Sequence, residues 1–223
     1  PTYGGVLMNS GTLTLDGVTV TGGKANNGGG IYNAAGATLT LTGTTSVTGN
    51  EATAADPADD TIDQGGGGGI LTRGTVIVSG GSVSGNTSVY GGAGIRGGTT
   101  STITISGGKV DGNRSTYPVT IEGTVTNGAA GGGIYTNGDL TVTGGSVSGN
   151  KTSYFGGGIT VQSTCADAEC KTVNRPTFTI SGGTVENNEQ TDSTGVGGGG
   201  GLWSDGVTTI TGGTIRANVA DLS

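Results

Sequence analysis

Short segments in which apolar and polar residues alternate recur along the whole chain. Residues 39–41 (Leu-Thr-Leu), 103–105 (Ile-Thr-Ile) and 140–142 (Leu-Thr-Val) are three of them. An alternation with a period of two predicts a β-strand with one buried face. A glycine cluster with a short apolar pair precedes each such strand. A single apolar residue follows the strand, and an Asn stands three positions after that residue. The pattern therefore predicts three short strands in each repeating unit.

The glycine clusters set the length of the repeat, and an aliphatic residue follows each cluster. In the shortest units these aliphatic anchors are 25 residues apart, as Ile70 is from Ile95, and every second unit is longer. The anchors are Val6, Ile31, Ile70, Ile95, Ile134, Ile159 and Leu202. A repeat of this length is typical of a solenoid, in which each unit packs only against its neighbours.

A unit with one or two apolar residues per strand has too little apolar surface to fold alone, so the units have to stack. The sequence therefore predicts an all-β fold, a right-handed parallel β-helix (single-stranded solenoid) of about seven three-strand coils. One inward column is predicted to hold Leu13, Leu39, Val76, Ile103, Leu140, Phe178 and Thr208. A second holds Leu15, Leu41, Val78, Ile105, Val142, Ile180 and Ile210, and a third holds Val47, Val83, Val110, Val147, Val185 and Ile215.

The composition fits this fold. Glycine accounts for 52 of the 223 residues, but only 4 are proline, which excludes a collagen helix. Charged residues make up 11% of the chain, fewer than a disordered chain normally carries. We expect one β-helix domain over residues 1–223. Because the chain begins with Pro1 rather than Met, we expect it to be a segment of a longer surface protein.

An Asn ends the third strand of most units. In stacked coils these residues would form a column, which comprises Asn50, Asn86, Asn113, Asn150, Asn188 and Asn218. Asn tolerates a left-handed backbone, and stacked Asn amides can form a hydrogen-bonded ladder, so we expect inward-pointing structural residues. The alternative is glycosylation, because Asn86, Asn113 and Asn150 match the acceptor pattern.

Four insertions interrupt the repeat, at residues 51–64, 114–130, 162–176 and 189–196. Three of them follow the Asn turn in alternate units, so we expect them to project from the same corner as a ridge that forms the contact surface. The alternative is that they are tolerated decoration.

The recurring Gly-Gly-x-Ile and Val-x-x-Asn signatures resemble the repeats of polymorphic outer-membrane-protein and autotransporter adhesin passengers. The chain is also similar, more loosely, to Gly/Thr-rich β-helix repeats of bacterial surface proteins. The resemblance implies an extracellular or cell-surface location and adhesion to a host or matrix protein or to a glycan. We expect no cofactor, with calcium as the one alternative.

Two features of the insertions suggest local chemistry. Cys165 and Cys170 are the only cysteines and can close a small disulfide loop in an oxidising compartment; a redox or metal pair is the alternative. Four carboxylates cluster in the first insertion: Asp56, Asp59, Asp60 and Asp63. They are weak calcium candidates, because calcium binds several oxygens but their spacing matches no known calcium loop.

An enzyme is the less favoured function. The chain has no His, the commonest general base. Pectin-lyase-like enzymes share the predicted architecture, and Asp111, Glu186 and Lys109 are the residues that a polysaccharide-binding or polysaccharide-cleaving site would use. Outward positions are otherwise mostly Ser and Thr, and fold alone does not imply catalysis. We therefore predict no catalytic residues.

The alternating strands carry outward threonines in Thr-x-Thr pairs. This face comprises Thr12, Thr14, Thr38, Thr40, Thr102, Thr104, Thr141, Thr177, Thr179 and Thr209, and Thr75 extends it. A flat Thr array resembles the ice-binding surface of β-solenoid antifreeze proteins. The alternative is a solvated strand surface, since Thr is a good strand former and Ile77, Asp139 and Val207 interrupt the columns.

Partners are limited by charge and hydropathy. With a net charge of −7 and nine scattered Lys and Arg residues, the chain is not expected to bind nucleic acid. No apolar run reaches the roughly 18 residues of a membrane helix, so we expect no membrane insertion by this segment. Copies of the chain stacked end to end through open coil edges, as a filament, are the remaining candidate partner.

Overall fold

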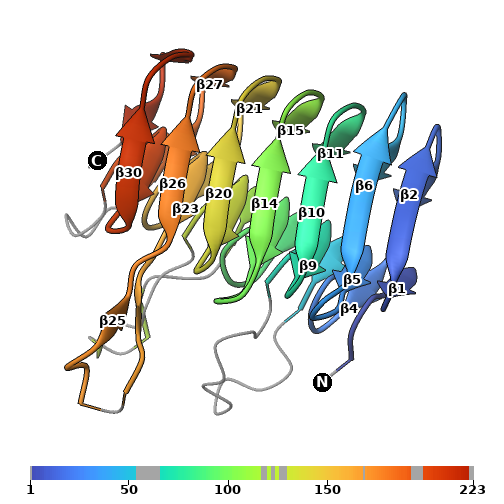
Figure 1. The fold of residues 1–223 in the computed structure, drawn as a ribbon, viewed down its shortest axis with the longest axis horizontal. Helices are drawn as coiled ribbons and strands as arrows, with labels where there is room; N and C mark the ends of the chain where they lie inside the picture. Colours follow the sequence, from blue (N-terminus) through green and yellow to red (C-terminus); the bar gives the residue numbers. More distant parts are fainter. Residues whose placement is uncertain are drawn as a thin grey trace.

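The computed structural model describes residues 2–53, 66–116, 120–121, 124–125, 130–167, 169–191 and 198–220. The chain is a right-handed parallel β-helix of seven coils, in which four parallel sheets of seven strands run along the axis (Figure 1). We name each sheet after its first strand. The fold class predicted from the repeat is confirmed.

The β1 sheet contains β1 (Leu7–Asn9), β5 (Ile31–Asn33), β9 (Ile70–Thr72), β13 (Ile95–Gly97), β19 (Ile134–Thr136), β23 (Ile159–Val161) and β29 (Leu202–Ser204). The β2 sheet contains β2 (Thr12–Asp16), β6 (Thr38–Thr42), β10 (Thr75–Val78), β14 (Thr102–Ile105), β20 (Asp139–Val142), β26 (Thr177–Ile180) and β30 (Val207–Ile210).

The β3 sheet contains β3 (Thr19–Thr21), β7 (Ser46–Thr48), β11 (Ser82–Ser84), β15 (Lys109–Asp111), β21 (Ser146–Ser148), β27 (Thr184–Glu186) and β31 (Thr214–Arg216). The β4 sheet contains β4 (Lys24–Ala25), β8 (Glu51–Ala52), β12 (Thr87–Ser88), β16 (Arg114–Ser115), β22 (Lys151–Thr152), β28 (Glu189–Gln190) and β32 (Val219–Ala220). Two antiparallel pairs, β17 (Thr120–Ile121) with β18 (Thr124–Val125) and β24 (Thr164–Cys165) with β25 (Val173–Asn174), lie in insertions.

Each coil has four strands, so the prediction of three strands per coil is wrong. The missed strands are those of the β4 sheet, which have two residues each and directly follow the Asn position. Two residues are too short to show an alternation, and their inward side chains are mostly small: Ala52, Ser88 and Ser115 are buried. As a result, residues 51–52, 114–115 and 189–190 are strands β8, β16 and β28, although we predicted them to begin insertions.

The first anchor also differs from the prediction. Leu7, not Val6, pairs with Ile31, and Leu7 packs against the core while Val6 is 50% exposed. Val6 takes the place that Gly30 has in the next coil. The first glycine cluster is thus one residue shorter than its later copies, and this shifted the register by one residue.

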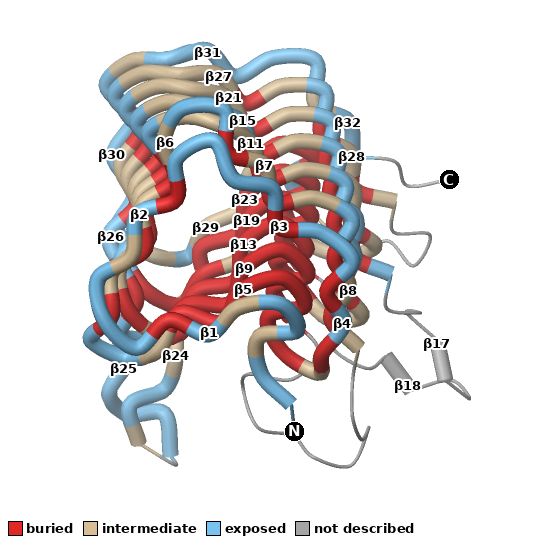
Figure 2. Tube along the Cα trace, turned by 90° about the vertical axis from the view of Figure 1, so that its right-hand side faces the viewer, coloured by how far each residue is buried: buried red, intermediate tan, exposed pale blue. Residues whose placement is uncertain are grey.

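The predicted apolar columns form one continuous core (Figure 2). Leu39, Val76, Ile103 and Phe178 are fully buried and lie in register on the β2 sheet. Val20, which has no Asn three positions later, extends the β3 column to the first coil, where it pairs with Val47. The exposed apolar residues include Ile210 and Ile215 of the last coil.

The Asn residues form the expected ladder along the axis. The backbone N–H and the Nδ2 group of Asn86 both donate to Oδ1 of Asn113, each at 3.0 Å. Asn113 repeats this towards Asn150, at 3.0 and 2.9 Å, and its Nδ2 also donates to the carbonyl of Val83. The same pattern links Asn50, Asn86, Asn113, Asn150, Asn188 and Asn218. Asn86, Asn113 and Asn150 are 0% exposed, so the folded coil does not offer them for glycosylation.

A second polar column lies at the corner between the β1 and β2 sheets. Asn9 Nδ2 donates to Asn33 Oδ1 at 2.8 Å, and Asn33 Nδ2 donates to Thr72 Oγ1 at 3.0 Å. Further along the axis, Ser101 Oγ lies 3.3 Å from Thr136 Oγ1. This column was not predicted because its residue type changes from coil to coil.

The glycine clusters are explained by the close approach of successive coils. A Cβ atom on Gly133 would lie 2.7 Å from the carbonyl oxygen of Gly158 and 2.8 Å from Asn150 Nδ2. Any larger residue at this position would therefore push the coils apart at the Asn ladder.

We predict that Asn113→Ala lowers the free energy of unfolding by at least about 3 kcal/mol. The substitution leaves two donors of Asn86 and the carbonyl of Val83 without their partner, and each buried polar group left in this way costs about 1–3 kcal/mol. Chemical denaturation followed by circular dichroism measures the change. Asn174→Ala, at an exposed position on β25, is the matched control and should change stability by less than about 0.5 kcal/mol. Equal effects of the two substitutions would contradict the role given to the ladder.

Candidate contact face on the β1 sheet

The four insertions leave the solenoid at the two corners that bound the β1 sheet. Three of them follow β8, β16 and β28, where Thr53, Thr116 and Thr191 still hydrogen-bond to the preceding coil at 2.8, 2.9 and 2.9 Å. They thus leave at equivalent points of alternate coils, and the chain returns in the glycine clusters before β9, β19 and β29. The fourth insertion lies between β23 and β26, at the opposite corner. A ridge was predicted from the insertions at residues 51–64, 114–130 and 189–196. Most of each insertion, namely residues 54–64, 117–119, 122–123, 126–129 and 192–196, lies outside the described residues.

The outward row of the β1 sheet is chemically mixed. In register along the axis it comprises Met8, Tyr32, Leu71, Arg96, Tyr135, Thr160 and Trp203. This row differs from the outward columns of the β2 sheet, which are mostly Thr. The Ile-Tyr pairs of this strand are recognisable in the sequence, but the row that their second residues form was not predicted.

Most aromatic residues of the chain gather on or beside this row. The sequence has six Tyr, two Phe and one Trp. Phe178 lies in the core and Tyr117 lies outside the described residues. The other seven are Tyr3, Tyr32, Tyr90, Tyr135, Tyr154, Phe155 and Trp203, on the β1 sheet or in the turns that precede its strands. These rings lie outside the aliphatic core, although Tyr32, Leu71, Arg96 and Thr160 of the row are themselves buried.

Ring contacts link several of these residues. The ring centroids of Tyr3 and Tyr32 are 4.8 Å apart, those of Tyr154 and Phe155 are 3.9 Å apart, and Phe155 stacks on Trp203 at 4.7 Å with an interplanar angle of 19°. Tyr32 is only 8% exposed, whereas Tyr154, Phe155 and Trp203 are half-buried. Tyr3 of the first coil is 37% exposed, and a group of three partly accessible rings lies toward the C-terminal coils.

A buried cation lies in the middle of the row. The Arg96 guanidinium lies 4.3 Å from the centre of the Tyr135 ring, and the side chain is 7% exposed. Burial lowers the pKa of Arg96 from its ordinary value, and Tyr135 opposes this change. Since arginine stays protonated in proteins, the contact is a cation–π interaction that orients the Tyr135 ring.

A polar corner borders the row where the β1 strands end. The Tyr135 hydroxyl donates to Gln162 Oε1 at 2.5 Å, and Asn137 Nδ2 donates to the Gln162 carbonyl at 3.0 Å. One coil further, the Ser163 amide donates to Asp205 Oδ1 at 2.5 Å. Asn137 is 4% exposed, and its Oδ1 accepts no hydrogen bond from any described residue. We call Asn137, Gln162 and Asp205 the polar corner.

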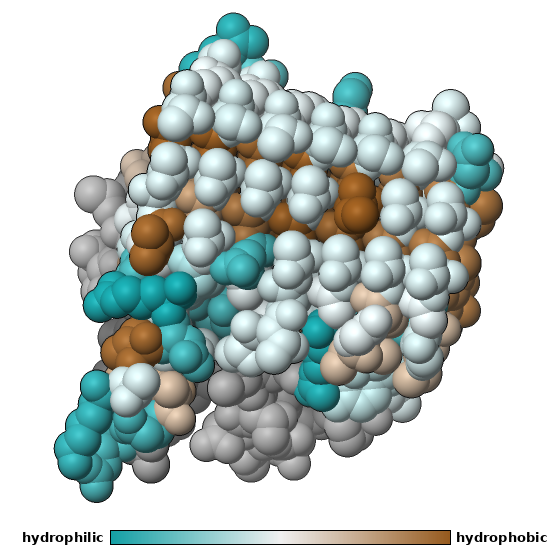
Figure 3. Space-filling model, in the orientation of Figure 1, coloured by the Kyte–Doolittle hydropathy of each residue, from teal (hydrophilic) through white to brown (hydrophobic). Residues whose placement is uncertain are grey.

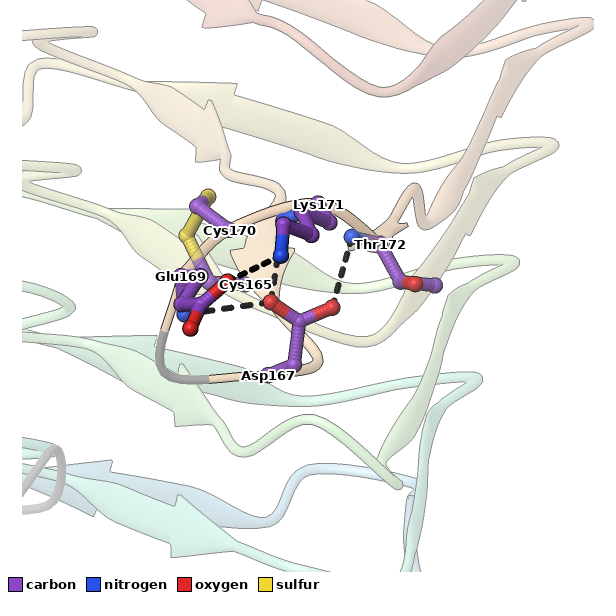
Figure 4. Close-up of a disulfide and its surroundings, with 6 residues drawn as sticks. All are labelled: Cys165, Asp167, Glu169, Cys170, Lys171 and Thr172. Carbon is purple, nitrogen blue, oxygen red and sulfur yellow. Dashed lines mark hydrogen bonds and ion pairs between the residues drawn. A yellow bond between two sulfur atoms is a disulfide. The ribbon is translucent and has the colours of Figure 1, made fainter.

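The predicted disulfide between Cys165 and Cys170 is confirmed, with the two Cα atoms 4.7 Å apart (Figure 4). It closes the hairpin of β24 and β25 below the β2 sheet (Figure 1). Inside the loop, Asp167 accepts backbone hydrogen bonds from Glu169 at 3.1 Å, Lys171 at 2.9 Å and Thr172 at 2.8 Å. These bonds, above all that from Lys171, lower the pKa of Asp167 from its ordinary value of 3.8.

The residues predicted for a polysaccharide site, Asp111, Glu186 and Lys109, do not form a cluster. Asp111 and Glu186 share one outward column, but Ser148 stands between them, and Glu186 pairs with Arg216 at 2.7 Å. Lys109 lies in the neighbouring column of the β3 sheet. Asp56, Asp59, Asp60 and Asp63, the calcium candidates, lie outside the described residues. Within the described ranges no three His, Cys, Asp or Glu side chains come together as metal ligands do.

The outward threonines do come together in register. Thr38 lies between Thr12 and Thr75, which continues to Thr102, and Thr104 continues to Thr141, Thr179 and Thr209. Figure 3 shows this face as regular rows of weakly polar residues, interrupted by a few apolar or strongly polar ones.

Comparison with known proteins adds nothing to this picture. No family model matches the chain, and neither does any curated protein or solved structure. No helix in the described ranges is both long and apolar enough to span a membrane.

We predict that the disulfide loop loosens in acid. A carboxylate whose pKa is lowered by folding stabilises the loop fully above its ordinary value of 3.8, and this stabilisation is lost as the pH falls through the lowered pKa. Amide exchange of Glu169, Lys171 and Thr172 should therefore accelerate below about pH 3.8 relative to that of the core strands. Asp167→Asn should weaken this pH dependence; an unchanged profile in that variant would contradict the assignment.

Proposed function

We propose that the chain is a non-enzymatic extracellular β-solenoid that serves as an adhesin-like or structural surface module. One observation carries the proposal: the insertion points, the disulfide hairpin and most aromatic residues converge on a single sheet and its two corners. We call this sheet face with its two corners the contact face. The partner is a host or matrix protein or a glycan.

The physical argument is that a solenoid separates its supporting core from its binding surface. The core and the Asn ladder use inward side chains, so loops at a corner can vary without disturbing them. The regular coils then hold the contact face rigidly. A disulfide in an exposed hairpin supports an oxidising, extracellular location. The resemblance to autotransporter passenger repeats supports display at a cell surface.

We predict that shortening the insertions abolishes binding while the fold persists. Residues 54–64, 117–129 and 192–197 would each be replaced by a turn as short as that of coil 1, which joins β4 to the next glycine cluster through Asn26 and Asn27. Screening both proteins on glycan and matrix-protein arrays measures the effect.

Circular dichroism and thermal unfolding serve as the control for folding. If the shortened protein binds as strongly as the original, the insertions are not the contact surface. If the original chain binds nothing on either array, the adhesive function is wrong and a purely structural role remains.

The Thr columns favour ice binding as a second candidate function. Strands of one sheet lie about 4.8 Å apart, and alternate residues of a strand lie about 6.6 Å apart, so the β2 sheet presents hydroxyl and methyl groups in a two-dimensional array. Such an array suits a ligand that is itself a periodic lattice. The in-register pairing of Thr12, Thr38, Thr75 and Thr102 is the specific observation in its favour.

For this candidate we expect measurable thermal hysteresis of the purified protein. Thr104→Leu, in the middle of the array, should reduce it by more than half, because one bulky residue holds the lattice away from its neighbours. Thr48→Leu on the β3 sheet is the control and should have no effect. Absence of hysteresis at millimolar protein concentration would rule the function out.

A further inference from the structure

Three aromatic residues linked by ring contacts, Tyr154, Phe155 and Trp203, are partly accessible on the contact face. Phe155 stacks nearly parallel on Trp203, and the tilted Tyr154 ring contacts Phe155. All three are half-buried, so each ring keeps part of its surface open to solvent. Thr160, the neighbour of Trp203 in the same row, donates to the Phe155 carbonyl at 2.9 Å and holds this turn in place. The result is a rigid aromatic platform.

The polar corner lies where the same strands end. Asp205 follows Trp203 by two residues, as Asn137 follows Tyr135, and Gln162 follows β23 of the coil between them. Gln162 and Asp205 are partly or fully exposed, and Asp205 is held by Ser163 and by Arg175, whose Nη1 donates to its carbonyl at 3.1 Å. The side chains thus offer carboxylate and amide groups beside the aromatic platform.

One polar atom of this corner is buried and has no hydrogen-bond partner among the described residues. Asn137 Oδ1 accepts no hydrogen bond within the described part of the chain, although its Nδ2 contacts the Gln162 carbonyl and the Tyr135 hydroxyl. A buried acceptor normally has a donor, because leaving it unpartnered costs free energy. Because Asn137 is itself buried, a ligand would contact this corner through the more exposed side chains of Asp205 and Gln162.

We propose that the platform and the polar corner form a binding site for a neutral oligosaccharide. A pyranose ring has an apolar face of C–H groups that packs on an aromatic ring, and hydroxyls around its edge that pair with carboxylates and amides. Phe155 and Trp203 bind the ring face, while Asp205 and Gln162 accept hydrogen bonds from the hydroxyls. The proposal rests on the proposed adhesive function and names the ligand class of its contact face.

The geometry fits a chain ligand better than a single sugar. Tyr135 and Trp203 are two strands apart in the β1 sheet, which corresponds to about 10 Å along the axis. The site can therefore contact consecutive sugar units of a glycan that runs along the solenoid. The net charge of −7 disfavours an acidic glycan, which is why we specify a neutral one.

Trp203 is the only tryptophan of the chain, so its fluorescence reports directly on the site. We would titrate the whole chain with cellotetraose, xylotetraose, mannotetraose and chitotetraose. We expect a saturable change in emission with at least one of them. Phe155→Ala and Asp205→Ala should each weaken that binding by about tenfold or more, as the loss of a central contact residue does.

Val207→Ala is the matched control. Val207 lies in the same coil, is 56% exposed and faces outward from the β2 sheet, so this variant should bind as the original does. Circular dichroism and thermal unfolding exclude misfolding of Phe155→Ala. If Phe155→Ala unfolds, the binding affinity of Gln162→Ala, which changes a surface position outside the core, tests the site independently.

The inference is wrong if none of the four sugars changes the emission or produces heat in calorimetry. It is also wrong if binding persists unchanged in Phe155→Ala, Gln162→Ala and Asp205→Ala. The array experiment separates this failure from failure of the proposed function. Binding to matrix proteins without binding to sugars leaves the adhesive function standing and removes only the glycan site, whereas no binding of either kind removes both.

Discussion

The stacking of thin coils is the constraint on which the rest of the structure depends. A coil buries only a few apolar side chains, such as Ile95, Ile103 and Val110, and these have no partners within their own coil other than one another. Burial becomes effective only when the next coil covers them. Hydrogen bonds along the axis keep the coils at the required separation and register. The Asn ladder does this inside the core, where Asn113 links Asn86 to Asn150 through both its backbone and its side chain.

This constraint explains where the chain varies. An insertion between the β2 and β3 strands would displace the aliphatic columns, and one just before Asn113 would break the ladder. The corner after the β4 sheet lies beyond the last inward side chain of the coil, and the glycine cluster that follows restores the register. Gly133 packs directly against the carbonyl of Gly158, so the chain has little room for a side chain where it returns to the solenoid. The three insertions at this corner therefore occupy positions where added residues disturb the core least.

The sequence predicted the fold well because the repeat itself is the physical cause of the fold. The inward columns and the Asn ladder could be predicted from spacing, since similar side chains recur at equivalent positions. The disulfide could be predicted because Cys165 and Cys170 are the only cysteines and lie close together in the sequence. The β4 sheet was missed because two residues, such as Thr87 and Ser88, carry no periodic pattern. The contact face was missed for a related reason: Tyr32, Leu71 and Arg96 occupy one row, but they share no chemical property that links them. Only the register places them together.

The contact face depends on the hairpin of β24 and β25. Its base is tied to the last coil by Ser163 and Arg175, which both bond to Asp205. The disulfide and the Asp167 carboxylate order the tip of the same hairpin. Three local restraints therefore act on one insertion, although nothing in the core requires it to be ordered. Ordering a surface loop costs conformational entropy. A loop with so many restraints is therefore best explained by a surface that must keep its shape. Asp205, to which the base of the hairpin is bonded, follows Trp203 of the aromatic platform by two residues.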